Sequence, residues 1–129
     1  MLLIAALFVG RYFFLGESEG TAGAQLYQAH CANCHMEQGQ GLGKLIPPVA
    51  QADYVAEHGA ELACGIVYGY QDSMVVNGTT YWQPMPGVEG LSPYEITTLI
   101  NYLKTAWGPQ GEPVAFAAVE AALDSCAQR

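Results

Sequence analysis

The sequence predicts an all-α domain, on two observations. Four stretches carry apolar residues at the spacing of a helix face, and only one short stretch has the form of a hairpin. Glycine and proline fill the connections between them, where turns are expected. A chain of 129 residues has the usual size of one domain. The four helices are expected at 22–32, 57–68, 92–107 and 113–126, a short helical turn at 53–56 and the hairpin at 74–81.

Residues 1–16 are apolar apart from Arg11, and we expect them to be a membrane anchor or an export signal. As a helix they would reach about 24 Å, less than the roughly 30 Å of a bilayer's hydrocarbon core. They also lack the basic residues that precede the apolar part of a signal peptide. An uncleaved anchor and an atypical export signal would both send the rest of the chain across a membrane. Residues 17–20 are then a polar linker.

The first helix leads into Cys31-Ala32-Asn33-Cys34-His35, which carries the clearest chemistry of the chain. The pattern C-x-x-C-H is the attachment site of a c-type haem. Cys31 and Cys34 can each form a thioether with one vinyl group of the porphyrin. His35 can then bind the iron as the proximal ligand. Because the pattern occurs once, one covalently bound haem c is expected.

Three other interpretations of these residues are open. A thioredoxin-like redox pair would need a preceding βαβ pattern, which the sequence does not show. A zinc site would also use His30, but adjacent His-Cys and Cys-His pairs suit tetrahedral coordination poorly. The third is a pair of buried thiols beside a surface histidine. The haem interpretation is favoured over all three.

Cys64 and Cys126 are left as an even pair once haem has used two of the four cysteines. Haem attachment takes place outside the cytoplasm, where disulfides persist, so we expect a Cys64–Cys126 disulfide. In the chain-entropy model, closing so long a loop stabilises the fold by roughly 4 kcal/mol. Two separate buried thiols are the alternative. A catalytic dithiol is disfavoured because the two cysteines lie far apart in the sequence.

The strongest helix signal begins at Ser92. Ser92 can cap the helix, Pro93 suits its first turn and Glu95 completes a capping box. Gly108-Pro109 is expected to end it. Its apolar stripe consists of Ile96, Leu99, Ile100 and Leu103, and the stripe of the last helix consists of Phe116, Val119, Leu123 and Cys126.

Acidic residues outnumber basic ones by 12 to 4, which gives a net charge of −8. So few basic residues cannot meet the phosphates of a nucleic acid, and no nucleic-acid partner is expected. The charge also argues against a lysine-rich docking face. A protein partner is expected to use a basic patch or a small apolar contact around the haem edge, unless the acidity serves only solubility.

Residues 21–107 resemble a class I c-type cytochrome. The likeness lies in the order of a helix entering C-x-x-C-H, Gly- and Pro-rich connections, a methionine in a loop and a strongly periodic closing helix. It implies an all-α cytochrome c fold in which the N- and C-terminal helices cross around one covalent haem. The residues matching that crossing are Gly23 and Tyr27 on the first helix and Leu99 and Tyr102 on the last. Residues 108–129 lie outside the minimal family fold and are expected to form a helical extension tied back by the disulfide.

The resemblance also implies a set of haem contacts. Met85, held between two prolines, matches the sixth iron ligand, with Met74 as the alternative. Met36 is too close to His35 to reach the other face of the haem. Pro47 lies at the position of the family proline whose carbonyl accepts a hydrogen bond from the proximal histidine. Trp82 and Tyr81, just before the Met85 loop, could each donate to a propionate or be a plain core aromatic, and Trp82 is the one expected at the haem. His30 and His58 are not expected to be ligands.

With both axial positions filled, the expected function is one-electron transfer, with no catalytic residue and no small-molecule substrate. The expected partners are membrane respiratory complexes: a quinol-oxidising donor and a terminal oxidase or reductase as acceptor. The protein is placed in the periplasm or at the extracytoplasmic face of the membrane. Two alternatives are a bound cytochrome subunit of a larger respiratory complex and a five-coordinate haem peroxidase or gas sensor.

Overall fold

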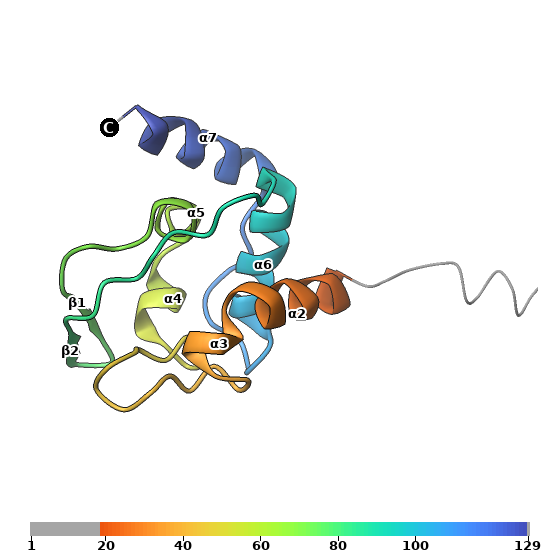
Figure 1. Cartoon of the computed structure of the whole chain (residues 1–129). Helices are drawn as coiled ribbons and strands as arrows, with labels where there is room; N and C mark the ends of the chain where they lie inside the picture. Colours follow the sequence, from red (N-terminus) through yellow and green to blue (C-terminus); the bar gives the residue numbers. More distant parts are fainter. Residues whose placement is uncertain (1–18, 129) are drawn as a thin grey trace, which may run out of the picture.

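A computed structural model describes residues 19–128, and the expected anchor or export signal at 1–16 lies outside this range. The all-α class is confirmed, since the strands within the described range are two of three residues each. Figure 1 shows α2 crossing α6, with α4 and α5 next to α6 and α7 across one end of the molecule. The elements are α2 (Glu19–His30), α3 (Ala32–His35), α4 (Asp53–Glu57), α5 (Leu62–Tyr68), β1 (Met74–Val76), β2 (Thr79–Tyr81), α6 (Pro93–Thr105) and α7 (Phe116–Ala127).

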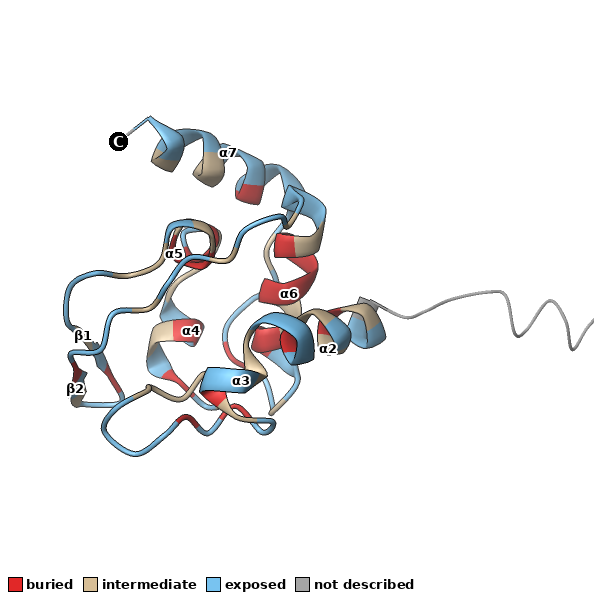
Figure 2. Cartoon of the chain, in the orientation of Figure 1, coloured by how far each residue is buried: buried red, intermediate tan, exposed pale blue. Residues whose placement is uncertain are grey.

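The crossing of α2 and α6 is the centre of the core. Gly23 is buried there, and a Cβ atom built on it would lie 2.5 Å from the Cβ atom of Tyr102. The missing side chain therefore lets the two helices approach closely. One turn later the fully buried ring of Tyr27 packs against Tyr102 and Trp107, with ring centroids 5.8 Å and 5.2 Å away. Figure 2 shows the buried positions of both helices gathered at this crossing.

Helix α6 begins as its sequence predicts. The Ser92 hydroxyl accepts a hydrogen bond from the Glu95 amide at 3.2 Å, and the Glu95 carboxylate accepts one from the Ser92 amide at 2.8 Å. This capping box satisfies backbone donors that an α-helix leaves free at its start. The bond from the Ser92 amide, followed by one that the Ser92 hydroxyl donates to the same carboxylate oxygen at 2.9 Å, lowers the pKa of Glu95, so the carboxylate stays charged beside the positive end of the helix.

Three expectations about the helices were wrong, the first being the start of the last helix, which lies at Phe116 and not at 113. The helix expected at 57–68 begins at Leu62, because His58 is extended and Gly59 follows it. The His58 ring ends the preceding helix instead, where its Nδ1 donates to the carbonyl of Tyr54 at 2.8 Å. The helix before the haem motif was expected to end at 32, but α2 ends at His30 and a second short helix follows. Residues 32–35 form the separate turn α3, whose first hydrogen bonds go to the carbonyl of Cys31.

The hairpin β1–β2 turns at Asn77-Gly78, as the sequence predicts. Both residues have positive φ, 50° and 75°, which suits the two-residue turn that joins antiparallel strands. The Asn77 side chain ties the turn back to α4, since its oxygen accepts a hydrogen bond from the Asp53 amide at 2.9 Å. The hairpin is thus fixed beside the start of α4.

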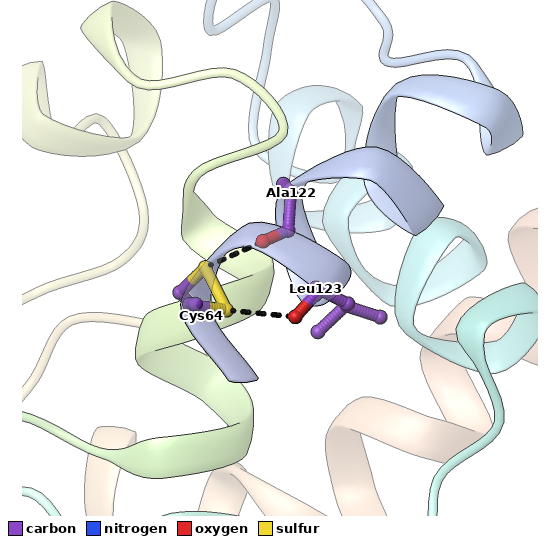
Figure 3. Close-up of a disulfide and its surroundings, with 4 residues drawn as sticks. Cys64, Ala122 and Leu123 are labelled. Carbon is purple, nitrogen blue, oxygen red and sulfur yellow. Dashed lines mark hydrogen bonds between the residues drawn. A yellow bond between two sulfur atoms is a disulfide. The ribbon is translucent and has the colours of Figure 1, made fainter. Parts of the chain in front are cut away.

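Helix α7 is fastened to α5 by a disulfide between Cys64 and Cys126, whose Cα atoms are 6.0 Å apart. The two sulfur atoms lie 3.3 Å and 3.4 Å from the carbonyl oxygens of Ala122 and Leu123 (Figure 3). Val119 is fully buried beneath the helix, whereas Phe116, expected in the same apolar stripe, begins the helix and is 42 % exposed. Helix α7 is therefore held by buried Val119, by Leu123, which packs against the core, and by one covalent bond.

Replacing both cysteines by serine (Cys64→Ser with Cys126→Ser) is expected to lower the free energy of unfolding by about 3–4 kcal/mol, because the disulfide closes a long loop in the unfolded chain. Denaturant unfolding of the two proteins measures the difference. Wild type treated with a thiol reductant serves as the control and should unfold like the variant. Equal midpoints for oxidised wild type and variant would contradict this account of the extension.

The Gly23→Ala variant is expected to lose about 1–3 kcal/mol of stability, because the new methyl group meets Tyr102. This cost outweighs the gain of about 1 kcal/mol in helix propensity. Gly59→Ala is the matched control, since a Cβ there would have its nearest contact at 3.7 Å. Thermal unfolding of both variants tests the crossing, and an unchanged melting temperature for Gly23→Ala would argue against it.

Candidate haem-binding site

A cavity of about 650 Å³ lies between α3, α4, α5, the hairpin and the loop that precedes α6. This volume is typical of a site for a large organic cofactor. Cys31, Cys34, His35, Met74 and Met85 all line it. The structure therefore brings both attachment cysteines, the proximal histidine and two methionines to one cavity.

His35 is 8 % exposed, and its ring is oriented by a hydrogen bond from Nδ1 to the carbonyl oxygen of Pro47 at 2.9 Å. A carbonyl can only accept, so Nδ1 carries the proton and Nε2 is left for a metal. Burial lowers the pKa of His35, and the bond to Pro47 acts in the opposite direction. The imidazole is therefore held neutral, in the form that binds iron.

The Pro47 carbonyl reaches His35 because the intervening loop is tightly turned. Gly41 has a φ of +70°, and a Cβ atom there would meet the Ile46 carbonyl and lie 2.7 Å from the Pro47 carbonyl. The amide of Gly41 donates to the carbonyl of His35 at 3.0 Å. A glycine is therefore required where this loop folds back on the histidine.

The two attachment cysteines differ in exposure. Cys31 is partly buried and Cys34 is exposed, and the turn α3 places both beside His35. Burial, followed by the nearby Cys34, raises the pKa of the free Cys31 thiol to about 11. One wall of the cavity thus carries a protonated thiol inside and a second thiol at the surface.

Met85 lies in a loop that is tied to the end of α5. Its amide donates to the Tyr70 carbonyl at 2.8 Å, and its carbonyl accepts from the Tyr70 amide at 3.0 Å. A third bond joins the Val88 amide to the Ile66 carbonyl at 2.7 Å. Gly69 has a φ of +77°, and a Cβ atom on it would meet the Met85 carbonyl. The backbone on both sides of Met85 is therefore fixed.

The structure does not bring every expected residue to the cavity. Trp82 is 75 % exposed and does not line it, so the structure gives no support to its expected contact with the haem. Tyr81 is buried but also lies outside the lining. Met36 does not line the cavity either, and its carbonyl accepts from the Tyr27 hydroxyl at 2.6 Å. The exposed position of Trp82 follows from the hairpin, which places Tyr81 inward and its neighbour outward.

Sequence analysis missed two tyrosines of the cavity wall. Tyr54 comes from α4 and Tyr70 follows α5, and the Tyr54 hydroxyl donates to that of Tyr70 at 3.5 Å. The ring of Tyr70 lies against Gly65, where any side chain would collide with it. Burial, with the contact to Tyr54, raises the pKa of Tyr70, which keeps the hydroxyl neutral. The two tyrosines meet only because folding brings α4 beside the residues that follow α5. A single sequence carries no signal of this contact.

Comparison with known sequences agrees with this site. The sequence model of the cytochrome c family matches residues 20–107, which hold the C-x-x-C-H motif and the Met85 loop. The chain belongs to the cytochrome c family. It is a monohaem class I c-type cytochrome, and it carries its haem c covalently, as that family does. Cys31, Cys34 and His35 fit this group, since they line one cavity and the histidine has its coordinating nitrogen free.

The relatives include a cytochrome c-552 and the cytochrome c subunit of a quinone alcohol dehydrogenase. Cytochrome c-552 of Thermus thermophilus is 37 % identical over 90 residues, which cover 67 % of this chain and 68 % of that protein. The cytochrome c subunit of the quinone alcohol dehydrogenase of Gluconobacter oxydans is 30 % identical over 91 residues, which cover 70 % of this chain but only 19 % of that subunit. The chain is therefore an electron-carrying cytochrome. None of the helices within residues 19–128 is long and apolar enough to cross a membrane.

The Gly69→Ala variant is expected to destabilise the Met85 loop, because its new methyl group meets the Met85 carbonyl. We expect a loss of about 2–4 kcal/mol, of which about 1 kcal/mol is the cost of a positive φ. Gly78→Ala is the matched control, since its φ of +75° is nearly the same and a Cβ there has no neighbour within 4 Å. Equal losses of stability in the two variants, measured by denaturant unfolding, would contradict the packing of the loop on α5.

Proposed function

We propose that this cytochrome passes single electrons from a quinol-oxidising complex to a terminal oxidase or reductase, with His35 and Met85 as axial ligands of its haem. The proposal rests on one observation: His35 and Met85 line the same cavity, and other parts of the chain hold each of them in place. The Pro47 carbonyl orients His35, and backbone hydrogen bonds fix the loop of Met85. Bound haem c supplies reversible one-electron exchange at its iron.

Met85 is a better candidate than Met74 for the second axial ligand. Met74 lies on β1 and packs against the hydrophobic core, so its thioether has apolar partners already. Met85 lines the cavity without belonging to the core cluster, and proline on each side restricts its backbone. A thioether is a weak ligand, and a loop that is already ordered loses little entropy when it binds. A methionine–histidine pair also favours the reduced state and raises the reduction potential.

Residues at the mouth of the cavity support electron exchange at a surface edge. Cys34 is exposed, and Leu45 lines the cavity while remaining 52 % exposed. Leu42, at 48 % exposure, lies in the same loop. These apolar side chains provide a small contact surface beside the attachment edge, while the net charge of −8 favours a basic surface on the partner.

The Cys64–Cys126 disulfide supports a location outside the cytoplasm, where such bonds persist. We therefore place the domain at the extracytoplasmic face of a membrane, with residues 1–16 as its anchor or export signal. A second candidate is a cytochrome subunit bound within a larger oxidoreductase. The likeness to the cytochrome subunit of quinone alcohol dehydrogenase favours it.

The Met85→Leu variant tests the proposed ligation. We expect the oxidised variant to lose the weak absorption band of methionine-ligated ferric haem and to become high-spin, because leucine cannot bind iron. Its reduction potential should fall, since the ferrous state loses its thioether. Met74→Leu is the matched control and should keep the band. Loss of the band in Met74→Leu alone would transfer the ligand role to Met74, and a high-spin wild type would favour a five-coordinate sensor or peroxidase.

A further inference from the structure

Gln110 is a buried polar residue that lies outside residues 20–107, the part of the chain that matches the cytochrome c family. It lies between α6 and α7, just beyond residue 107, and is 4 % exposed. Its Oε1 accepts from the Ala52 amide at 2.7 Å. Its Nε2 donates to the carbonyls of Val49 at 3.1 Å and Leu103 at 2.7 Å. One amide group thus joins the end of α6 to the segment that follows Pro47.

The backbone of Gln110 is itself firmly held. Its amide donates to the Lys104 carbonyl at 2.8 Å, and its carbonyl accepts from the Lys104 ammonium group at 3.3 Å. Lys104 is 1 % exposed, and the same ammonium group donates to the Val55 carbonyl at 2.8 Å. The backbone of Gln110 is therefore fixed to the end of α6, and its side chain is buried.

The segment that Gln110 holds carries the hydrogen-bond acceptor of the proximal histidine. Val49 lies two residues after Pro47, and Pro48 stands between them. The ring of Pro48 fixes its φ, which is one of the few backbone torsions between the Pro47 carbonyl and Val49, so a displacement of Val49 is passed on to that carbonyl. From the other side, the amides of Val49 and Ala50 donate to the Gly39 carbonyl at 2.8 Å and 2.9 Å. The segment is thus held between the loop after α3 and Gln110.

We propose that Gln110 is a positioning residue that sets the hydrogen bond from His35 to Pro47 and thereby the donor strength of the proximal ligand. The inference rests on the proposed axial role of His35. A strong bond at Nδ1 makes the imidazole a better donor and stabilises the oxidised iron. Without the Gln110 hydrogen bonds to Val49 and Ala52, the segment that carries Pro47 is less firmly placed, and the hydrogen bond from His35 to Pro47 becomes longer on average. The reduction potential should then become more positive.

Asn101 provides a matched control. Its side chain also makes two hydrogen bonds to the backbone of another residue: Nδ2 donates to the Val114 carbonyl at 3.1 Å, and Oδ1 accepts from the Val114 amide at 2.8 Å. Neither Asn101 nor Val114 lines the haem cavity. Loss of these two hydrogen bonds should reduce stability without affecting the hydrogen bond from His35 to Pro47.

The experiment compares Gln110→Met with Asn101→Leu in the haem-loaded protein. Both variants should melt at lower temperature than wild type. Only Gln110→Met should shift the midpoint potential to a more positive value. In the ferrous protein, it should also speed hydrogen exchange at His35 Nδ1 by about tenfold, which corresponds to losing roughly one hydrogen bond of support. Gln110→Asn keeps the amide on a shorter side chain, so it should shift the midpoint potential and the exchange rate less than Gln110→Met does. It replaces Gln110→Met in the comparison if that variant does not fold.

A lower melting temperature with unchanged potential and unchanged exchange in Gln110→Met, or in Gln110→Asn, would overturn the proposal and leave Gln110 a structural residue. Equal shifts of potential in the Gln110 and Asn101 variants would overturn it too. Failure of the proposed function is separable, because it would appear as a high-spin spectrum of the wild type. Even then the exchange of the His35 ring proton would report whether Gln110 controls the bond to Pro47.

Discussion

The hydrogen bond from His35 Nδ1 to the Pro47 carbonyl is the interaction around which the loop between α3 and α4 is arranged. It requires a chain reversal within a few residues, which glycine at position 41 permits. It also requires the acceptor to stay in place, which the bonds from Val49 and Ala50 to the Gly39 carbonyl achieve. A neutral imidazole with its Nε2 free is the chemical result, and this is the state from which a histidine binds haem iron.

The cavity is built from two parts that are stabilised separately. The histidine side depends on the crossing of α2 and α6, which fixes where α3 begins. The methionine side depends on α5, whose end is paired with the Met85 loop. Residues beyond 107 contact both parts, through Gln110 on the histidine side and through the Cys64–Cys126 disulfide on the methionine side. The extension is therefore joined to the supports of both proposed ligands.

Sequence reasoning succeeded where chemistry is local. The C-x-x-C-H motif, the Ser92 capping box and the Asn77-Gly78 turn each depend on residues within a few positions of one another, so one sequence suffices to predict them. It failed at the start of α5, because His58 forms a side-chain bond that ends α4 and no periodicity reveals it. It could not identify Tyr70 or Gln110, whose roles depend on partners brought together only by the folded chain. Trp82, expected at the haem, is 75 % exposed because its neighbour Tyr81 takes the inward position of the strand.

Electron paramagnetic resonance of the oxidised wild-type protein tests the central claim, that both axial positions of the haem iron are filled by side chains of this chain. A low-spin ferric signal without a substantial high-spin component is expected. A dominant high-spin signal would contradict it, because the iron would then have an open or water-bound position. Electron transfer through a His35/Met85 pair would have to be abandoned in favour of a haem that binds an external ligand.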